Sequence, residues 1–365
     1  MRPIIASYEM FSDNLDEKME KIMSESPLGN EVNDERLSQL VVWLKTIFKQ
    51  DELDISVASA DASFRRYFRI LTPDHADAKS WVVMDAPPDK EDCKPFIYVC
   101  NAFLSMEVNV PKIYAKDLTQ GFLVLSDFGS TCFLDKLNEQ NVDSLYGDAM
   151  ATLLHLQTHT KPKDVSFPPY DDALLMREMQ LFPDWFLKKH MSIHVSSEIE
   201  KILNKTFRQL SDNTLSQPVV WVHRDFHSRN LMLLEKNNPG VIDFQDAVEG
   251  PITYDLVSLL RDCYIDWDVN RVENWVKKYW TKLQALDVCT DVAFDDFLKW
   301  FDWMGVQRHL KAIGIFSRLN YRDGKSGYLA DIPRTLNYVV QVSKKYPELQ
   351  AFHDFVSTLE TPEPV

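Results

Sequence analysis

The chain has 365 residues, of which 45% are apolar and 26% charged, the ordinary balance of a globular protein with a sizeable core. Its 55 acidic residues outnumber its 40 basic ones, and the resulting net charge of −15 argues against general binding to nucleic acids or anionic membranes. The five cysteines show no zinc-site or disulfide spacing, and no uncharged apolar stretch approaches about 18 residues. We therefore expect reduced thiols, no membrane span and a cytoplasmic location.

The first 127 residues predict an extension followed by a small lobe with a sheet. Residues 1–34 are polar, and we interpret them as an extension with a possible helix over 15–23. The lobe over 35–127 contains, in chain order, a helix over 36–48, an extended aromatic-rich run over 54–71, a turn over 73–79, a strand over 81–85, a helix over 94–106, and strands over 111–115 and 121–125.

Residues 128–365 predict a larger, mostly helical lobe with a polar hairpin. Its predicted elements are helices over 142–158, 170–190 and 197–210, a strand over 219–222, a hairpin of strands over 231–234 and 240–242, and further helices from Tyr254 onward. The organisation indicates an α+β chain of two lobes.

The chemistry is indicated by a polar stretch that lies between apolar strands. An H-R-D triplet ends at Asp225, Asn230 follows five residues later, and Asp243 opens a D-F-Q triplet after the predicted hairpin. Kinases use this H-R-D-x-x-x-x-N pattern with a later D-F motif for phosphoryl transfer from ATP. Asp225 is the candidate base, and Asn230 and Asp243 offer the hard oxygen ligands that Mg²⁺ prefers. The alternative is a loop of solvated acids, which would leave costly polar groups between apolar strands.

With these motifs, residues 221–262 resemble the aminoglycoside phosphotransferase superfamily of small-molecule kinases. The resemblance extends to 61–69, 84–88, 122–129 and 307–311, and over about 36–345 the chain is similar to the anomeric kinases for N-acetylmuramate and N-acetylglucosamine. That family serves peptidoglycan recycling in Gram-negative bacteria. The resemblance implies a protein-kinase-like, two-lobed α+β fold with a small antiparallel-sheet lobe and a larger, mostly helical lobe. It also implies an ATP- and Mg²⁺-dependent kinase that phosphorylates the C1 hydroxyl of the sugar.

The resemblance also implies roles for residues near the motif. Asp225 would be the catalytic base, with Asn230 and Asp243 holding Mg²⁺. His223 would orient the loop, and Asp255 would hold the loop through its backbone amides. For His223 and Asp255 a purely structural role is the alternative.

The nucleotide contacts are less well defined by the sequence. Leu125 and Ser126 would lie at the hinge, where backbone groups meet adenine. The strand that carries a phosphate-binding Lys or Arg in such kinases has neither here. We expect Arg65, Arg66 or Arg69 on the neighbouring strand to replace it; a solvated basic strand face is the alternative.

The sugar site is expected in the helical lobe, where planar polar groups and aromatic faces could hold a sugar. The candidates are Glu178, Asp184, Arg261, Asp262, Tyr264, Trp267, Gln307, Arg308, His309 and Lys311, of which we select Glu178, Arg261, Gln307, Arg308 and Lys311. Arg308 or Lys311 would suit the lactyl carboxylate of N-acetylmuramate. The alternative is that these residues lie on solvated faces of amphipathic helices over 174–187 and 297–316.

Other functions remain open at this point. The chain could phosphorylate an aminoglycoside, choline or homoserine, or it could be a kinase-like scaffold that binds nucleotide without catalysis. A protein kinase is disfavoured because the chain lacks a Gly-rich loop and an A-P-E segment. We expect ATP and a small amino sugar as partners, with no nucleic acid or membrane, and a monomer.

Overall fold

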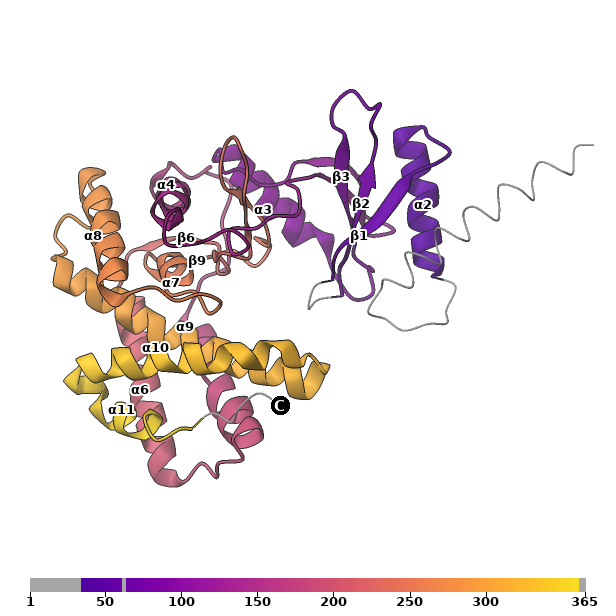
Figure 1. The fold of residues 1–365 in the computed structure, drawn as a ribbon. Coiled ribbons are helices and arrows are strands. Elements are labelled where there is room, and N and C mark those ends of the chain that lie inside the picture. Colours follow the sequence, from indigo (N-terminus) through magenta and orange to yellow (C-terminus); the bar gives the residue numbers. More distant parts are fainter. Residues whose placement is uncertain (1–33, 61–63, 361–365) are drawn as a thin grey trace, which may run out of the picture. The chain divides into compact units, whose positions relative to one another are not determined.

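The computed structural model describes residues 34–60 and 64–360 (Figure 1). They form two compact units. The first comprises the described residues up to Cys100 together with Pro111–Ser130, and the second comprises Asn101–Val110 and the described residues from Thr131 onward. The predicted helix over 15–23 lies outside the described residues.

The first unit is a five-stranded antiparallel sheet with one helix packed on it. Its elements are α2 (Glu35–Phe48), β1 (Asp54–Ala60), β2 (Arg66–Leu71), β3 (Ser80–Asp85), β4 (Ile113–Asp117), β5 (Phe122–Ser126) and the start of α3 (Cys93–Ser105). The strand order is β1-β2-β3-β5-β4. The prediction of one extended run over 54–71 was wrong, because the chain reverses there and Asp54 of β1 pairs with Leu71 of β2. The reversal contains no Gly or Pro that would have indicated a turn.

The apolar face of α2 and one face of the sheet form the core of this unit. The buried residues include Leu37, Leu40, Leu44, Phe68, Ile70, Val83 and Val124. The helix begins where the Asp34 carboxylate accepts the Leu37 amide at 3.0 Å, a standard N-terminal cap. Beside this cap the fully buried Asp85 carboxylate is shared by Arg36 and Arg66. These ion pairs fix the start of α2 against β2 and β3.

The second unit is mostly helical, as predicted. Its helices are α4 (Val142–Thr158), α5 (Asp172–Met179), the π-helix η1 (Phe182–His190), α6 (Ser197–Leu215), α7 (Tyr254–Leu260), α8 (Val269–Ala285), α9 (Phe294–Asp323), the 3₁₀ helices η2 (Ser326–Asp331) and η3 (Pro347–Leu349), α10 (Ile332–Lys345) and α11 (Gln350–Val356). Its strands are β6 (Val219–Val222), β7 (Leu231–Met232), β8 (Gly240–Val241) and β9 (Val248–Pro251). Within the described part of the chain, every helix is too short or too polar to cross a bilayer.

In this unit one predicted helix is divided and one strand was missed. The single helix expected over 170–190 is divided into α5 and the π-helix η1, in which the Met191 amide donates to the Phe186 carbonyl at 2.9 Å. Pro183 has no amide to donate near the start of η1. The strand β9, which pairs with β6, was not predicted because Gly250 and the proline after it look like a turn. A Cβ on Gly250 would lie 3.0 Å from that of Tyr170, so close packing requires glycine in this strand.

Helix α9 is the central element of the second unit. It packs against α6, α7, η1 and α10, and Figure 1 shows α10 running across it. Every residue from Phe301 to Lys311 is buried. The expectation of an amphipathic helix over 297–316 was therefore wrong for its middle, and the polar residues there face the interior of the unit.

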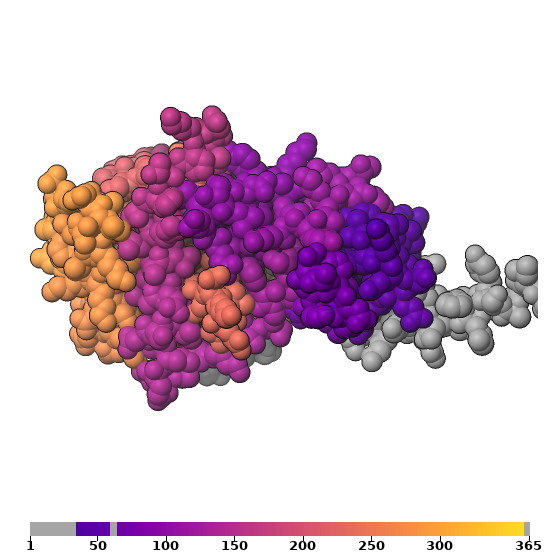
Figure 2. All heavy atoms as spheres, turned by 90° about the horizontal axis from the view of Figure 1, so that it is seen from above, coloured from indigo at the N-terminus to yellow at the C-terminus, as the bar shows by residue number. Residues whose placement is uncertain are grey.

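The hairpin expected near residue 237 is present as β7 and β8. Its loop is held by the Asn238 side chain, which donates to Asp148 at 2.8 Å, and by the Val241 amide, which donates to Asn109 O at 2.8 Å. In Figure 2 a salmon-coloured segment lies at the surface among magenta residues, as expected for the contact of this hairpin with α4. The hairpin connects the H-R-D loop to the D-F-Q triplet.

Candidate active site

The loop after β6 is held by a carboxylate from α7. The two oxygens of Asp255 accept the backbone amides of His223 at 2.7 Å and Arg224 at 3.0 Å. Asp255 is fully buried in the first turn of α7. Burial raises the pKa of Asp255 to about 7, although the two amides act in the opposite direction. The loop backbone is thus fixed at the two residues that precede Asp225.

His223 links this loop to the end of the hairpin. Its Nε2 lies 3.1 Å from the Ile242 carbonyl, and its Nδ1 accepts the Asp225 amide at 3.2 Å. These partners assign the proton to Nε2. Burial lowers the pKa of His223 to about 4, so the ring is neutral at pH 7. It holds the Asp225 amide and the Ile242 carbonyl at a fixed separation.

Asn230 and Asp243 lie side by side, as a shared metal ion would require. The Asn230 Nδ2 donates to the Asp225 carbonyl at 2.9 Å and to Asp243 Oδ2 at 3.3 Å. Gln245 donates to the other Asp243 oxygen at 2.9 Å. Because the amide nitrogen of Asn230 is used in this way, its Oδ1 is the atom suited to ligation. One amide oxygen and one carboxylate fit the preference of Mg²⁺ for a few protein oxygens combined with substrate phosphates.

Two backbone positions in the site have unusual geometry. Arg224 has φ of 77° and Asp243 has φ of 63°, in the left-handed region that non-glycine residues seldom adopt. Such positions cost on the order of 1–3 kcal/mol and persist where surrounding bonds enforce them. For Arg224 these bonds come from Asp255 at the backbone and from Glu178 at the guanidinium.

The half-buried Asp225 has the electrostatic properties of a base. Burial alone would raise the pKa of its carboxyl group, but the positive charge of Lys311, together with charges that include Arg308 and Arg224, lowers that pKa below its ordinary value. Asp225 is therefore ionised at neutral pH and can accept a proton from a hydroxyl group.

A buried polar cluster beneath the loop brings together several predicted sugar-site residues. Glu178 Oε1 accepts Arg224 at 2.5 Å and lies 3.2 Å from Lys311 Nζ, while Oε2 accepts the Tyr170 hydroxyl and the Gln307 amide. We call Tyr170, Glu178, Arg224, Gln307 and Lys311 the Glu178 network. Burial alone would raise the pKa of Glu178, but Lys311 and Arg224 lower it, so the network contains an ionised carboxylate between two cations.

The other sugar-site candidates lie in separate surroundings. Arg261 pairs with the fully buried Asp302. Asp262 accepts the backbone amide of Ser228 at 2.9 Å. It thus holds at a second point the loop of residues 223–230 after β6, which we call the catalytic loop. Tyr264 stacks edge-on against His227 at 5.3 Å, and Arg229 lies over its ring at 3.6 Å.

Three further candidates are bonded away from the catalytic loop. Asp184 pairs with Lys188 on η1 at 2.8 Å. Trp267 donates to the Tyr146 hydroxyl at 3.2 Å. His309 lies 2.9 Å from the Arg261 carbonyl and is fully buried. None of these contacts brings the three side chains to Asp225.

The three arginines near β2 have different partners in the first unit. Arg66 bonds both Asp34 and Asp85. Arg69 bonds Asp127 at 2.6 and 3.0 Å and the Gly129 carbonyl at 2.8 Å. Arg65 lies 3.6 Å from Glu91.

The predicted hinge residues are bonded within the same sheet. Leu125 is buried in β5. The Ser126 amide donates to the Lys112 carbonyl at 2.9 Å, and its hydroxyl accepts the Lys112 amide at 2.9 Å.

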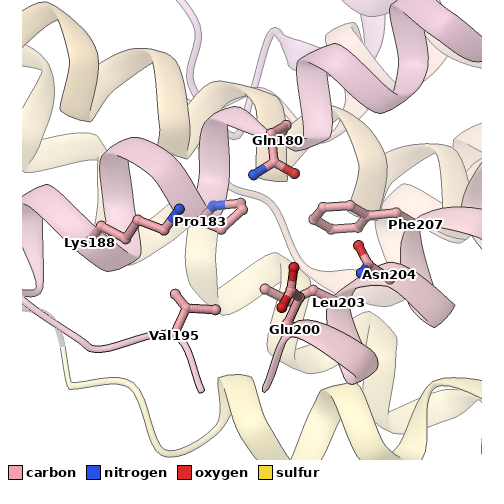
Figure 3. Close-up of a pocket in the computed structure, with 8 residues that line it drawn as sticks. All are labelled: Gln180, Pro183, Lys188, Val195, Glu200, Leu203, Asn204 and Phe207. Atoms are coloured by element: carbon pink, nitrogen blue, oxygen red, sulfur yellow. The ribbon is translucent and has the colours of Figure 1, made fainter. Parts of the chain in front are cut away.

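A surface hollow occurs elsewhere, between η1 and α6 (Figure 3). It is lined by Gln180, Pro183, Lys188, Val195, Glu200, Leu203, Asn204 and Phe207. None of these residues belongs to the catalytic loop or the Glu178 network, so the hollow gives no support for a sugar site there.

Comparison with known proteins identifies the family. Residues 54–289 match the phosphotransferase enzyme family. The chain belongs to this family. It is 44% identical over 319 residues to the N-acetylmuramate/N-acetylglucosamine kinase of Neisseria meningitidis, covering 86% of this chain and 93% of the relative. It is 42% identical over 338 residues to the kinase of that name from Pseudomonas putida, covering 90% and 98%.

Solved structures of small-molecule kinases share the fold. The Plasmodium vivax ethanolamine kinase aligns with a TM-score of 0.60 at 10% identity, covering 96% of this chain and 98% of that one. An ADP-bound aminoglycoside phosphotransferase aligns with a TM-score of 0.56 at 15% identity, covering 85% and 99%. These similarities confirm the protein-kinase-like, two-lobed fold class that was predicted from the sequence.

Proposed function

We propose that this chain is an ATP- and Mg²⁺-dependent kinase that phosphorylates the anomeric C1 hydroxyl of N-acetylmuramate and N-acetylglucosamine. The products are the sugar 1-phosphate and ADP, which fits a role in cell-wall recycling in the cytoplasm. The observation that carries this proposal is the identity of 42–44% over 86–90% of the chain with kinases named for these two sugars. The geometry of the catalytic loop is compatible with the same reaction.

The proposed role of Asp225 is to accept the proton of the attacking hydroxyl. As the C1 oxygen forms a bond to the γ-phosphorus, the bond from that phosphorus to the bridging oxygen of ADP breaks, and the hydroxyl proton moves to Asp225. The lowered pKa of Asp225 keeps the carboxylate ionised before the sugar binds. His223 and Asp255 act through the loop backbone, because their side chains are bonded to it.

Asn230 and Asp243 are the residues proposed to hold Mg²⁺. When bound, this ion would neutralise charge on the phosphates of ATP, and those phosphates would supply its remaining ligands. The hydrogen bonds from Asn230 to Asp243 and from Gln245 to Asp243 fix the two oxygen donors before the nucleotide arrives.

The decisive experiment is a reaction of the full chain with ATP, Mg²⁺ and each sugar in turn. We expect ADP release that depends on the sugar, and a ³¹P NMR signal from a phosphate attached to the anomeric carbon. Phosphorylation of choline, homoserine or an aminoglycoside with no turnover of either amino sugar would overturn the proposal. Nucleotide binding without any acceptor-dependent ADP release would indicate a scaffold without catalysis.

A further inference from the structure

Arg308 is a buried guanidinium on α9 that lacks a carboxylate partner. Only 6% of the residue is exposed. Within residues 34–60 and 64–360, no carboxylate oxygen lies within 4.0 Å of its nitrogens, and its Nε has no hydrogen-bond partner. Its one hydrogen-bond contact there is with the Cys263 sulfur, at 3.8 Å. A buried cation with so few partners has lost its hydration without a comparable replacement.

Other deeply buried cations of this unit are paired. Arg261 bonds Asp302, and Lys311 lies 3.2 Å from Glu178 and donates to the Tyr254 hydroxyl at 2.9 Å. Lys311 therefore already has a carboxylate partner within the protein, which it shares with Arg224. Arg308 and Lys311 were the two sequence candidates for binding a substrate carboxylate. Because only Arg308 lacks a carboxylate partner in the described residues, it is the better candidate.

Arg308 also lies on the side of the unit where the reaction is proposed. Its contact residue Cys263 directly follows Asp262, which holds the catalytic loop at Ser228. The charge of Arg308 is close enough to help lower the pKa of Asp225. The nearby His227 has a lowered pKa because it is buried, so its ring does not supply a competing positive charge at neutral pH.

We propose that Arg308 determines specificity by binding the lactyl carboxylate of N-acetylmuramate, a group that N-acetylglucosamine lacks. The inference rests on the proposed function above and adds a ligand for one group of one substrate. The planar guanidinium matches a carboxylate in shape and charge, and such paired contacts are stronger than neutral hydrogen bonds. On this proposal, Arg308 contributes to the binding of one sugar much more than to that of the other.

The test compares Arg308→Met with the wild-type chain on both sugars. We expect kcat/KM for N-acetylmuramate to fall about 10- to 100-fold, the range for a lost hydrogen bond between charged groups. The change should appear mainly in KM for N-acetylmuramate. Any loss for N-acetylglucosamine should be much smaller, because Arg308 is one of several cations that lower the pKa of Asp225. Arg322→Met, which removes an exposed arginine from the same helix, is the matched control and should leave both sugars unaffected.

A second comparison removes the charge from the substrate instead. The wild-type chain should turn over the methyl ester of N-acetylmuramate less efficiently than the free acid, whereas Arg308→Met should treat the two alike. The two losses should not add, because both changes remove the same contact.

The outcomes distinguish this inference from the proposed function. A wild-type chain that phosphorylates neither sugar contradicts the proposed function. In another outcome, the wild-type chain is active on both sugars while Arg308→Met loses kcat/KM equally for both. That result would show that Arg308 acts only by lowering the pKa of Asp225, and it would overturn the present inference. Should the methionine variant fail to fold, Arg308→Lys decides in the same way, because it keeps the charge and loses the paired geometry.

Discussion

Asp225 shows how single residues determine the electrostatics of the candidate site. It is half-buried and yet has a lowered pKa, because cations on α9 and in the loop outweigh the effect of burial. Its position is fixed through its own amide, which is bonded to His223, and through its carbonyl, which is bonded to Asn230. A substitution at Asp225 should therefore remove the proton acceptor with little effect on the surrounding loop.

We expect Asp225→Asn to reduce kcat by about 10²- to 10⁴-fold, the usual contribution of a general base. ATP binding, measured by calorimetric titration, should change little. Asp184→Asn is the control, since this carboxylate pairs with Lys188 on η1, and it should retain full turnover. Wild-type turnover in Asp225→Asn would exclude this residue as the base.

The Glu178 network predicts a different result for a carboxylate beneath the loop. Glu178→Gln leaves Arg224 and Lys311 without their shared buried carboxylate. Breaking a buried ion pair from one side costs about 3–5 kcal/mol, and we expect this loss in the free energy of unfolding measured with urea. Glu200→Gln, at an exposed position of α6, should change it by less than about 0.5 kcal/mol. Equal stability of the two variants would mean that the network does not stabilise the fold.

The arginines near β2 give a third prediction at this scale. We expect at least one of Arg65→Met, Arg66→Met and Arg69→Met to raise KM for ATP, because these residues offer the positive charge that β3 lacks. Arg66→Met should also lower the melting temperature of the chain, since Asp34 and the buried Asp85 lose a partner. Unchanged ATP kinetics in all three variants would refute the substitution of these arginines for the usual phosphate-binding residue.

At the scale of elements, α9 depends on a close approach to the segment before η1. A Cβ on Gly314 would lie 2.5 Å from the Leu181 carbonyl carbon, a distance that requires backbone movement. We expect Gly314→Ala to destabilise the chain by about 1–3 kcal/mol in urea unfolding, as other overpacked sites do. In contrast, Gly147→Ala on α4 meets nothing within 4 Å and should stabilise by up to about 1 kcal/mol. If both variants changed the free energy of unfolding in the same direction, Gly314 and Leu181 would not be in close contact in solution.

The elements also show which features could be predicted from the sequence. The bounds of α4 and β6 were predicted correctly, because their apolar spacing is a local signal. The strand β9 could not be predicted, because its extended form depends on pairing with β6 and on close packing against Tyr170. The middle of α9 was misinterpreted for a similar reason, since its polar residues are bonded to distant segments.

Across the whole molecule, the candidate catalytic motif could be located from the sequence, but the Glu178 network beneath it could not. Asp225, Asn230 and Asp243 fall within one short stretch with a recognisable spacing. The Glu178 network joins residues far apart in the chain, such as Tyr170 and Gln307, which are separated by 137 positions. No periodicity in the sequence connects such residues. Two glycines near this region, Gly250 and Gly314, pack closely against Tyr170 and Leu181.

Acid sensitivity is a further property of the whole molecule. Burial lowers the pKa of His309 to about 3, well below its unfolded value of about 6.5. The unfolded chain therefore takes up a proton that the folded chain does not, and stability decreases as the pH falls below about 6.5. Each such histidine contributes about 1.4 kcal/mol per pH unit. His309→Gln should make the decrease in unfolding free energy between pH 6.5 and 4.5 shallower by that slope.

The control for this prediction is His194→Gln, which replaces an exposed imidazole. Buried Asp255, whose raised pKa of about 7 acts in the opposite direction, is present in both variants and cancels in the comparison. Parallel pH curves for His309→Gln and the wild-type chain would show that His309 does not remain neutral in the folded state.

The short segment 101–110 determines how this kinase can be dissected experimentally. It precedes β4 in the chain but belongs to the second unit, where Phe103 packs against Phe167, Trp221 and Phe244. A fragment that starts at Thr131 would lack Phe103 and would expose the aromatic side chains that Phe103 covers. Each unit consists of two separate stretches of the chain, so a single truncation cannot separate the units. To express the helical unit alone, residues 101–110 will have to be fused in front of Thr131.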